Sequence, residues 1–137
     1  MTKAYLMNSA RYLDGLSAGD DLWSNSQGMG LMDLGRAFDP VERVLRDQLG
    51  SDLFTGTGQE RLITGLVDDP TEPVRITISW TDAPGATFGN AFNNDLDLEV
   101  QVAGQTYRGN NFNGEFSVPG GSADFRNNTE SVVLPPG

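Results

Sequence analysis

The sequence contains no cysteine and no histidine. Without cysteine no disulfide can form and no iron–sulfur cluster can be held, and without either residue no zinc site built on thiolates or imidazoles is possible. A complete Ser-His-Asp or Cys-His catalytic set is excluded for the same reason. Metal chemistry in this chain must therefore rely on oxygen ligands, which suit calcium or magnesium.

Positive charge is also scarce. The chain carries 9 Lys and Arg residues against 19 Asp and Glu residues, a net charge of -10, and Lys3 is the only lysine. Phosphate contacts need a basic surface, so we predict no nucleic-acid partner. No apolar run approaches the ~20 residues that a membrane span needs, and the first residues lack the pattern of a secretory signal.

What the sequence does contain is typical of a β-rich domain with many turns: 17 glycines in 137 residues and several short runs in which apolar and polar residues alternate. Apolar spacing predicts helices over residues 3–13 and over 39–49, where Asp39 and Pro40 supply an N-terminal cap and a first helical residue. Alternation predicts strands over 62–67, 74–80, 96–102, 106–108 and 131–134. We therefore predict a mainly β fold, an antiparallel sandwich of the jelly-roll kind preceded by helices.

The strongest chemical feature is a row of carboxylates on one face of a predicted strand, formed by Asp95, Asp97 and Glu99. Like charges aligned in this way are unfavourable unless a cation compensates them, and calcium takes carboxylate and amide oxygens. Eight of the ten asparagines lie between residues 90 and 128, and Asp124 and Glu130 are further candidates. The alternative is a solvated strand face with turn-forming asparagines. The predicted calcium ligands are Asp95, Asp97, Asn94, Asp82, Asn110 and Asn128.

Two segments near the N-terminus resemble the end of the catalytic domain of subtilisin-like serine proteases (subtilases). Residues 3–10 read KAYLMNSA, and residues 28–35 read GMGLMDLG, followed by Arg36 and Ala37. In that family a helix with a similar sequence follows the catalytic serine by roughly 30 residues. The Gly-Thr-Ser-Met stretch that holds this serine does not occur here, so no catalytic residue can be assigned in the chain.

The remainder resembles the C-terminal β-domain of a group of bacterial subtilases. The matching stretches occur in order: VRITISWTDAPG over residues 74–85, NDLDL over 94–98, YRGN over 107–110 and NNTESVV over 127–133. In the family this domain is a jelly-roll sandwich that binds calcium. It also continues beyond the point that corresponds to Gly137, so we expect a truncated sandwich whose open edge favours a strand-exchanged oligomer.

The resemblance implies three parts: residues 1–39 as the end of a catalytic domain, 40–60 as a helix and linker, and 61–137 as the β-sandwich. It implies a non-catalytic, calcium-binding part of a secreted serine endopeptidase, which braces the catalytic domain and is inactive alone. The implied partners are the rest of the catalytic domain and, through the parent enzyme, protein substrates. Two alternatives remain: a carbohydrate- or protein-binding module attached to a protease, suggested by Trp23 in a loop, and a stand-alone structural protein.

Overall fold

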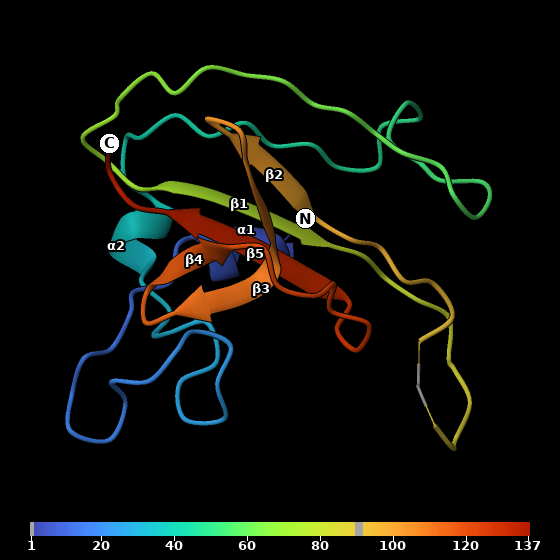
Figure 1. Cartoon of the computed structure of the whole chain (residues 1–137), viewed down its shortest axis with the longest axis horizontal. Helices are drawn as coiled ribbons and strands as arrows, with labels where there is room; N and C mark the ends of the chain where they lie inside the picture. The colour runs from blue at the N-terminus through green and yellow to red at the C-terminus, as the bar shows by residue number, and fades with distance from the viewer. Residues whose placement is uncertain (1, 90–91) are drawn as a thin grey trace.

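The computed structural model describes residues 2–89 and 92–137, and most of its regular structure is β (Figure 1). Two short helices come first and five strands follow, arranged in two antiparallel sheets. A mainly β fold was predicted and is confirmed. The elements are α1 (Thr2–Asn8), α2 (Leu34–Ala37), β1 (Val74–Ser79), β2 (Glu99–Val102), β3 (Gln105–Asn113), β4 (Phe116–Pro119) and β5 (Thr129–Leu134).

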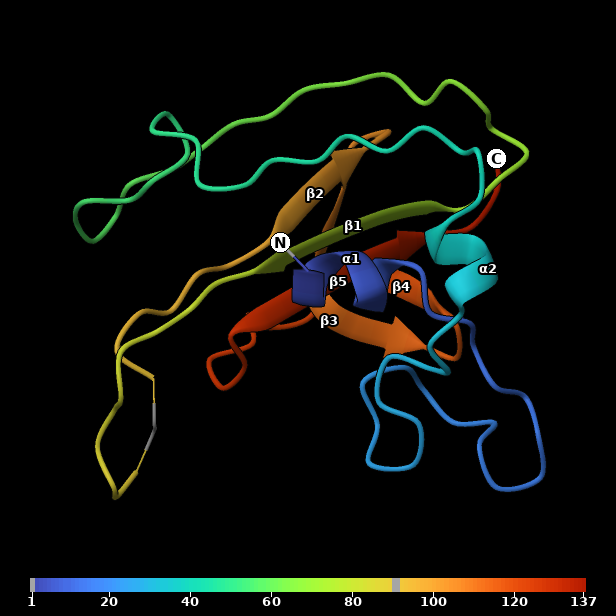
Figure 2. The ribbon, with the colours of Figure 1, turned by 180° about the vertical axis from the view of Figure 1, so that it is seen from behind.

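The first sheet pairs β1 with β5 from Val74↔Leu134 to Ser79↔Thr129. Its strands are rich in β-branched residues, which suit a pleated, half-buried surface. Two hydroxyl pairs link them across the ladder: Thr77 Oγ1 lies 2.9 Å from Ser131 Oγ, and Ser79 Oγ lies 3.1 Å from Thr129 Oγ1. Helix α1 packs against β1, as both views of the ribbon show (Figures 1 and 2).

The second sheet has the order β2-β3-β4. The turn between β2 and β3 consists of Ala103 and Gly104, whose φ angles are 49° and 77°. Two consecutive positive φ values are the hallmark of a tight hairpin turn that matches the twist of the strands. Strands β3 and β4 both contact β5, so β5 is the strand of the first sheet on which the second sheet packs.

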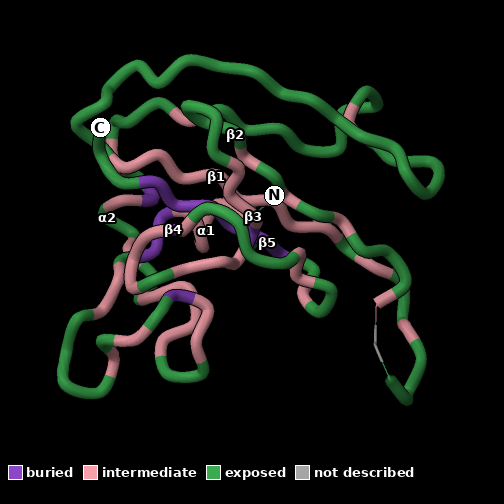
Figure 3. Tube along the Cα trace, viewed as in Figure 1, coloured by how far each residue is buried: buried purple, intermediate pink, exposed green. Residues whose placement is uncertain are grey.

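The core is built around β5, in which all six residues are buried (Figure 3). Val132 and Val133 supply its apolar contacts, with exposed fractions of 0% and 2%. The same strand buries Thr129, Glu130 and Ser131, and the Ser117 hydroxyl of β4 accepts the Val133 amide at 3.0 Å. Buried polar groups are tolerated when they are hydrogen-bonded, and among these residues Glu130 has one side-chain oxygen without such a bond.

The segment from residue 39 to residue 73 differs from the sequence-based prediction. It contains neither the helix expected over 39–49 nor the strand expected over 62–67, and it forms a long exposed arch over the rest of the molecule (Figures 1 and 3). The apolar residues of both predicted elements lack a surface to pack on, and an isolated helix of this length is marginal in water. The exposed apolar residues are Val41, Val44, Leu45, Leu49, Leu53, Phe54, Leu62, Ile63, Leu66 and Val67.

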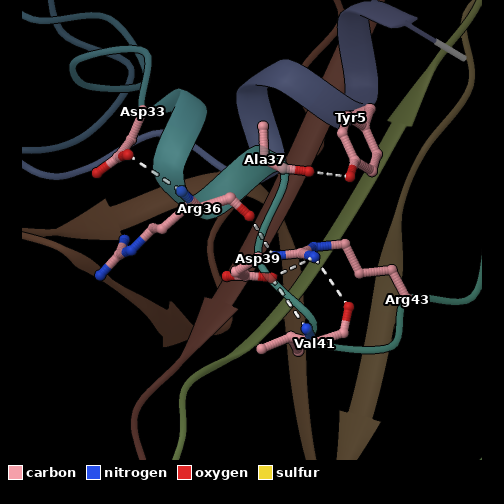
Figure 4. Close-up of polar contacts among 7 residues, drawn as sticks. All are labelled: Tyr5, Asp33, Arg36, Ala37, Asp39, Val41 and Arg43. Atoms are coloured by element: carbon pink, nitrogen blue, oxygen red, sulfur yellow. Dashed lines mark hydrogen bonds and ion pairs between the residues drawn. The ribbon is translucent and has the colours of Figure 1, made fainter.

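The arch is anchored where it leaves α2 (Figure 4). The Asp33 side chain caps α2 by accepting the Arg36 amide at 3.1 Å, and the Tyr5 hydroxyl of α1 donates to the Ala37 carbonyl. Arg43 then folds back: its Nη2 donates to the Arg36 carbonyl at 2.7 Å, and its Nη1 pairs with Asp39 Oδ1 at 2.8 Å. Asp39 therefore closes a local turn with Arg43 instead of starting the predicted helix.

Other boundaries shift less. The helix expected over 3–13 ends at Asn8, and the strand expected over 96–102 begins only at Glu99. Residues 95–98 are irregular, so Asp95 and Asp97 precede β2 instead of lying on its face. The predicted strands over 74–80 and 131–134 are confirmed as β1 and β5.

Candidate functional site

Glu130 is the most unusual residue of the structure. It lies in β5 with an exposed fraction of 1%, and the Leu98 amide donates to its Oε2 at 2.7 Å. No hydrogen bond to a described residue satisfies its other oxygen, Oε1. Gly109 of β3 lies directly against the side chain, because a Cβ at that position would overlap the Glu130 carboxyl and its Cβ. A buried carboxyl oxygen with no donor is costly unless a proton or a cation accompanies it.

The surroundings of Glu130 are acidic. Burial of the carboxyl raises the pKa of Glu130 to about 7, although the Leu98 hydrogen bond acts in the opposite direction. The negative charges of Asp97, Asp124 and Asp95 raise this pKa further. These four residues are called the acidic cluster below.

Asp124 is held in place by amide groups. Asn110 Nδ2 donates to its Oδ2 at 2.7 Å, Asn127 Nδ2 donates to the same oxygen at 2.6 Å, and the Arg126 amide donates to Oδ1 at 3.0 Å. Burial acts to raise the pKa of Asp124, but the hydrogen bonds from Asn110 and Asn127 outweigh it and hold the pKa below its usual range. Asp124 therefore stays ionised beside Glu130.

The predicted ligand Asn110 works as a support for this arrangement. Its backbone has a φ of 58°, a left-handed conformation that asparagine tolerates better than most residues. Besides Asp124, its Nδ2 donates to the Thr129 carbonyl at 2.9 Å, and its Oδ1 accepts the Ser131 amide at 3.1 Å. The amide oxygen of Asn110 is thus engaged with β5, and its role here is to fix Asp124 and the start of β5.

Asp95 and Asp97 complete the acidic cluster from the irregular segment before β2. Both are exposed, and no hydrogen bond to their carboxylates occurs within residues 2–89 and 92–137. Partial burial raises the pKa of Asp95, and the charges of Asp97 and Asp124 add to the effect. Two free carboxylates next to a buried one form a strongly negative region that is open to solvent on one side.

The other predicted ligands lie in two separate groups. Asp82 accepts hydrogen bonds from the backbone amides of Asn93 and Asn94 at 2.5 and 2.9 Å, and from Asn94 Nδ2 at 2.7 Å. The backbone bond from Asn94, followed by the one from Asn93, lowers the pKa of Asp82 most. Asn128 Oδ1 accepts the Lys3 ammonium at 2.8 Å, and its Nδ2 donates to the Trp80 carbonyl at 3.1 Å. Asp82 and Asn94 therefore brace a turn, and Asn128 ties α1 to β1.

The structure thus brings together Asp95, Asp97 and Asn110 of the six predicted residues and adds Asp124 and Glu130, which the sequence offered only as further candidates. The signal for Glu130 was a single carboxylate at the start of an apolar strand, TESVVL. Within the described part of the chain, no group of three acidic side chains is arranged closely enough to hold a metal ion as it stands. The exposed carboxylates of Asp95 and Asp97 would have to turn toward Glu130 to do so.

Comparisons with known proteins add no identification: no protein-family model, no curated protein and no solved structure matches the chain. Neither of the helices in the described residues has the length and apolar character to cross a membrane.

Proposed function

We propose that this chain is the non-catalytic C-terminal part of a secreted subtilisin-like serine endopeptidase, in which a jelly-roll-like β-domain braces the catalytic domain and binds calcium at the acidic cluster. The parent enzyme would hydrolyse peptide bonds with a Ser-His-Asp set that this chain does not contain. The observation that carries the calcium proposal is the buried Glu130 Oε1, which has no hydrogen-bond partner among the described residues and experiences the negative charges of three further carboxylates.

The chemistry of the acidic cluster fits calcium. Carboxylate oxygens are its preferred ligands, and a calcium ion neutralises the repulsion that raises the pKa values of Glu130 and Asp95. Asp124 and Glu130 would provide fixed ligands, and Asp95 and Asp97 would provide ligands from the irregular segment. When bound, the ion supplies a structural crosslink between this segment and β5.

The bracing role is supported by the contacts of the N-terminal segment. Asn8 Nδ2 donates to Thr77 Oγ1 of β1 at 3.3 Å, and Arg75 Nη1 donates to the Ala10 carbonyl at 3.3 Å. These two hydrogen bonds join the stretch that resembles a subtilase catalytic domain to the first sheet, and a third, from Lys3, reaches Asn128, the residue before β5. Because α1 is fixed to the β-domain by these bonds, the β-domain would stabilise the catalytic domain to which we propose that α1 belongs.

A thermal unfolding experiment tests the calcium site. The full chain is stripped with EDTA and its Tm is measured with and without millimolar calcium. We expect an increase of about 5 °C or more, because an ion that binds only the folded state stabilises it by linkage. Asp124→Asn should abolish the increase, whereas the matched variant Asp82→Asn should keep it. An unchanged Tm, or an increase lost equally in both variants, would refute a site at the acidic cluster.

The protease relation is tested by the gene that encodes this chain. We expect its reading frame to encode, upstream of Met1, a Gly-Thr-Ser-Met stretch with the catalytic serine. The alternative of a carbohydrate-binding module predicts instead that the chain binds glycans on an array and that Trp23→Ala removes this binding. Glycan binding without an upstream serine would favour the alternative.

A further inference from the structure

A shallow cavity of about 340 Å³, open to solvent, lies between α1 and the loop that follows it. Leu6 and Met7 of α1 form one wall, and Trp23, Met29 and Met32 form the other, with Lys3 at its edge. Among the described residues that line it, Lys3 is the only charged one. This group is called the Trp23 cavity below.

The loop wall of the Trp23 cavity is held rigidly. Arg11 and Leu31 exchange two backbone hydrogen bonds of 2.8 Å, and Gly30, with a φ of 98°, passes so close to the Arg11 carbonyl that no side chain would fit. Trp23 has a φ of 64°, which is rare for a bulky residue, and its amide donates to the Gly28 carbonyl at 2.6 Å. Strained backbone that the surroundings enforce is typical of ligand sites.

The lining indicates the class of ligand. Methionine side chains are unbranched and polarisable, so three of them around an indole adapt to a flexible aliphatic chain. A sugar would need several convergent hydrogen-bonding side chains, and the described lining residues offer only the Lys3 ammonium and the Trp23 indole N–H. The lining therefore favours an aliphatic ligand over a carbohydrate.

The charges indicate the rest of the ligand. In a chain with a net charge of -10, Lys3 lines this cavity, and the Nη1 atoms of Arg36 and Arg75 donate to the carbonyl of the lining residue Ala10 at 3.4 and 3.3 Å. Arg75 is paired with Glu115 at 3.1 Å, so Lys3 and Arg36 supply most of the positive charge here. Lys3 is positioned by Asn128, which takes one of the three ammonium hydrogens and leaves two for a ligand. A carboxylate would be repelled from most of this acidic surface but attracted here.

From this geometry we infer that the Trp23 cavity binds a medium-chain aliphatic carboxylate, with the hydrocarbon chain among Met7, Trp23 and Met29 and the carboxylate on the Lys3 ammonium. The volume lies at the lower end of the range for small-molecule sites, which limits the ligand to a short chain. This inference is independent of the calcium site, since no residue is shared between the two.

The experiment is a calorimetric titration of the full chain with decanoate, decanol and butyrate, each below its micelle or solubility limit. We expect saturable 1:1 binding of decanoate, weaker binding of decanol and no measurable binding of butyrate. Lys3→Gln should weaken decanoate about tenfold, to the level of decanol, and leave decanol unchanged. The matched control Arg61→Gln, which removes one positive charge from the exposed arch, should change neither.

A second variant tests the apolar wall. Met29→Gln keeps the length of a half-buried side chain that lies between two glycines, and it should weaken decanoate and decanol alike, about tenfold. Trp23 fluorescence in a Trp80→Phe background reports the same binding by a second signal. The proposal is overturned if decanoate fails to saturate, if Lys3→Gln and Arg61→Gln behave alike, or if Met29→Gln leaves decanol binding intact while the chain remains folded.

Discussion

The strand β5 and the arch over residues 39–73 contain similar apolar residues but differ in where those residues lie. All six residues of β5 are buried, whereas Leu62, Leu66 and Val44 of the arch are each close to 90% exposed or more. The strand has a pairing partner in β1 and is covered by β3 and β4, whereas no strand or helix of the described residues covers the arch in this way. Apolar patterning therefore produces a stable element only where the tertiary structure offers a second surface.

Alanine substitutions at two glycines, Gly109 beside β5 and Gly65 in the arch, should differ most in their cost to stability. Gly109→Ala should destabilise the fold by about 3 kcal/mol, because the new methyl group meets Glu130 Cβ at a position too close to the backbone to move away. Gly65→Ala in the arch meets no atom and should change the free energy of unfolding by less than about 1 kcal/mol. Urea unfolding of both variants measures the difference, and similar midpoints would show that β3 and β5 are not packed as described.

A pair of valines sharpens the comparison. Val132 has an exposed fraction of 0% and Val44 one of 88%. Val132→Ala should cost about 2 kcal/mol, through lost burial and the cavity that remains. Val44→Ala should stay within about 0.5 kcal/mol of the parent chain. If Val44→Ala proved as costly as Val132→Ala in the same urea series, the arch would be packed in solution.

A third expected effect concerns the pH dependence that Glu130 imposes in the absence of calcium. Its pKa is raised from 4.5 to about 7 in the folded state, so between these values the folded chain holds a proton that the unfolded chain has lost. Stability should therefore fall as pH rises from 4.5 to 7, by about 2 kcal/mol once solvent screening is allowed for.

The measurement compares the parent chain with Glu130→Gln in EDTA, at pH 5 and pH 8. Glutamine does not titrate in this pH range, so the difference in unfolding free energy between the two proteins isolates the contribution of Glu130 from that of other carboxylates. Saturating calcium should remove this fall in the parent chain, because the ion replaces the proton. Identical pH profiles for both proteins would contradict a buried, uncompensated Glu130.

The smallest effect separates two ion pairs. Arg75 pairs with Glu115 at 3.1 Å with side chains 15% and 31% exposed, and Arg46 pairs with Asp52 at 2.7 Å in the arch with 39% and 27% exposed. Glu115→Gln should cost about 1 kcal/mol, because it leaves the Arg75 guanidinium partly buried without its partner. Asp52→Asn should cost about 0.5 kcal/mol or less, as exposed pairs do. Chemical unfolding measures the loss of unfolding free energy for each variant. Equal losses would contradict the expected difference between the half-buried and the exposed ion pair.

Much of the β architecture could be predicted from alternation alone. The runs at 74–80 and 131–134 became β1 and β5, and the glycine at 104 marked the hairpin between β2 and β3. The helix predicted over 39–49 does not form, although its capping residues and apolar stripe are typical of a helix. The reason is that its apolar residues have no surface to pack on, and the sequence alone does not reveal this. The sequence likewise identified Asp95 and Asp97, but Glu130 became central only through its burial.

Composition alone limits the chemistry that this chain can perform. The lack of cysteine and histidine limits it to oxygen ligands, and the excess of 19 acidic over 9 basic residues sets the sign of its surface. The tertiary structure decided which residues share that chemistry. In the folded chain Asp82 and Asn94 lie apart from Asp124 and Glu130. Asp82 and Asn94 satisfy each other by hydrogen bonds in a turn. The packing of β5 against Gly109 instead leaves one oxygen of Glu130 without a donor.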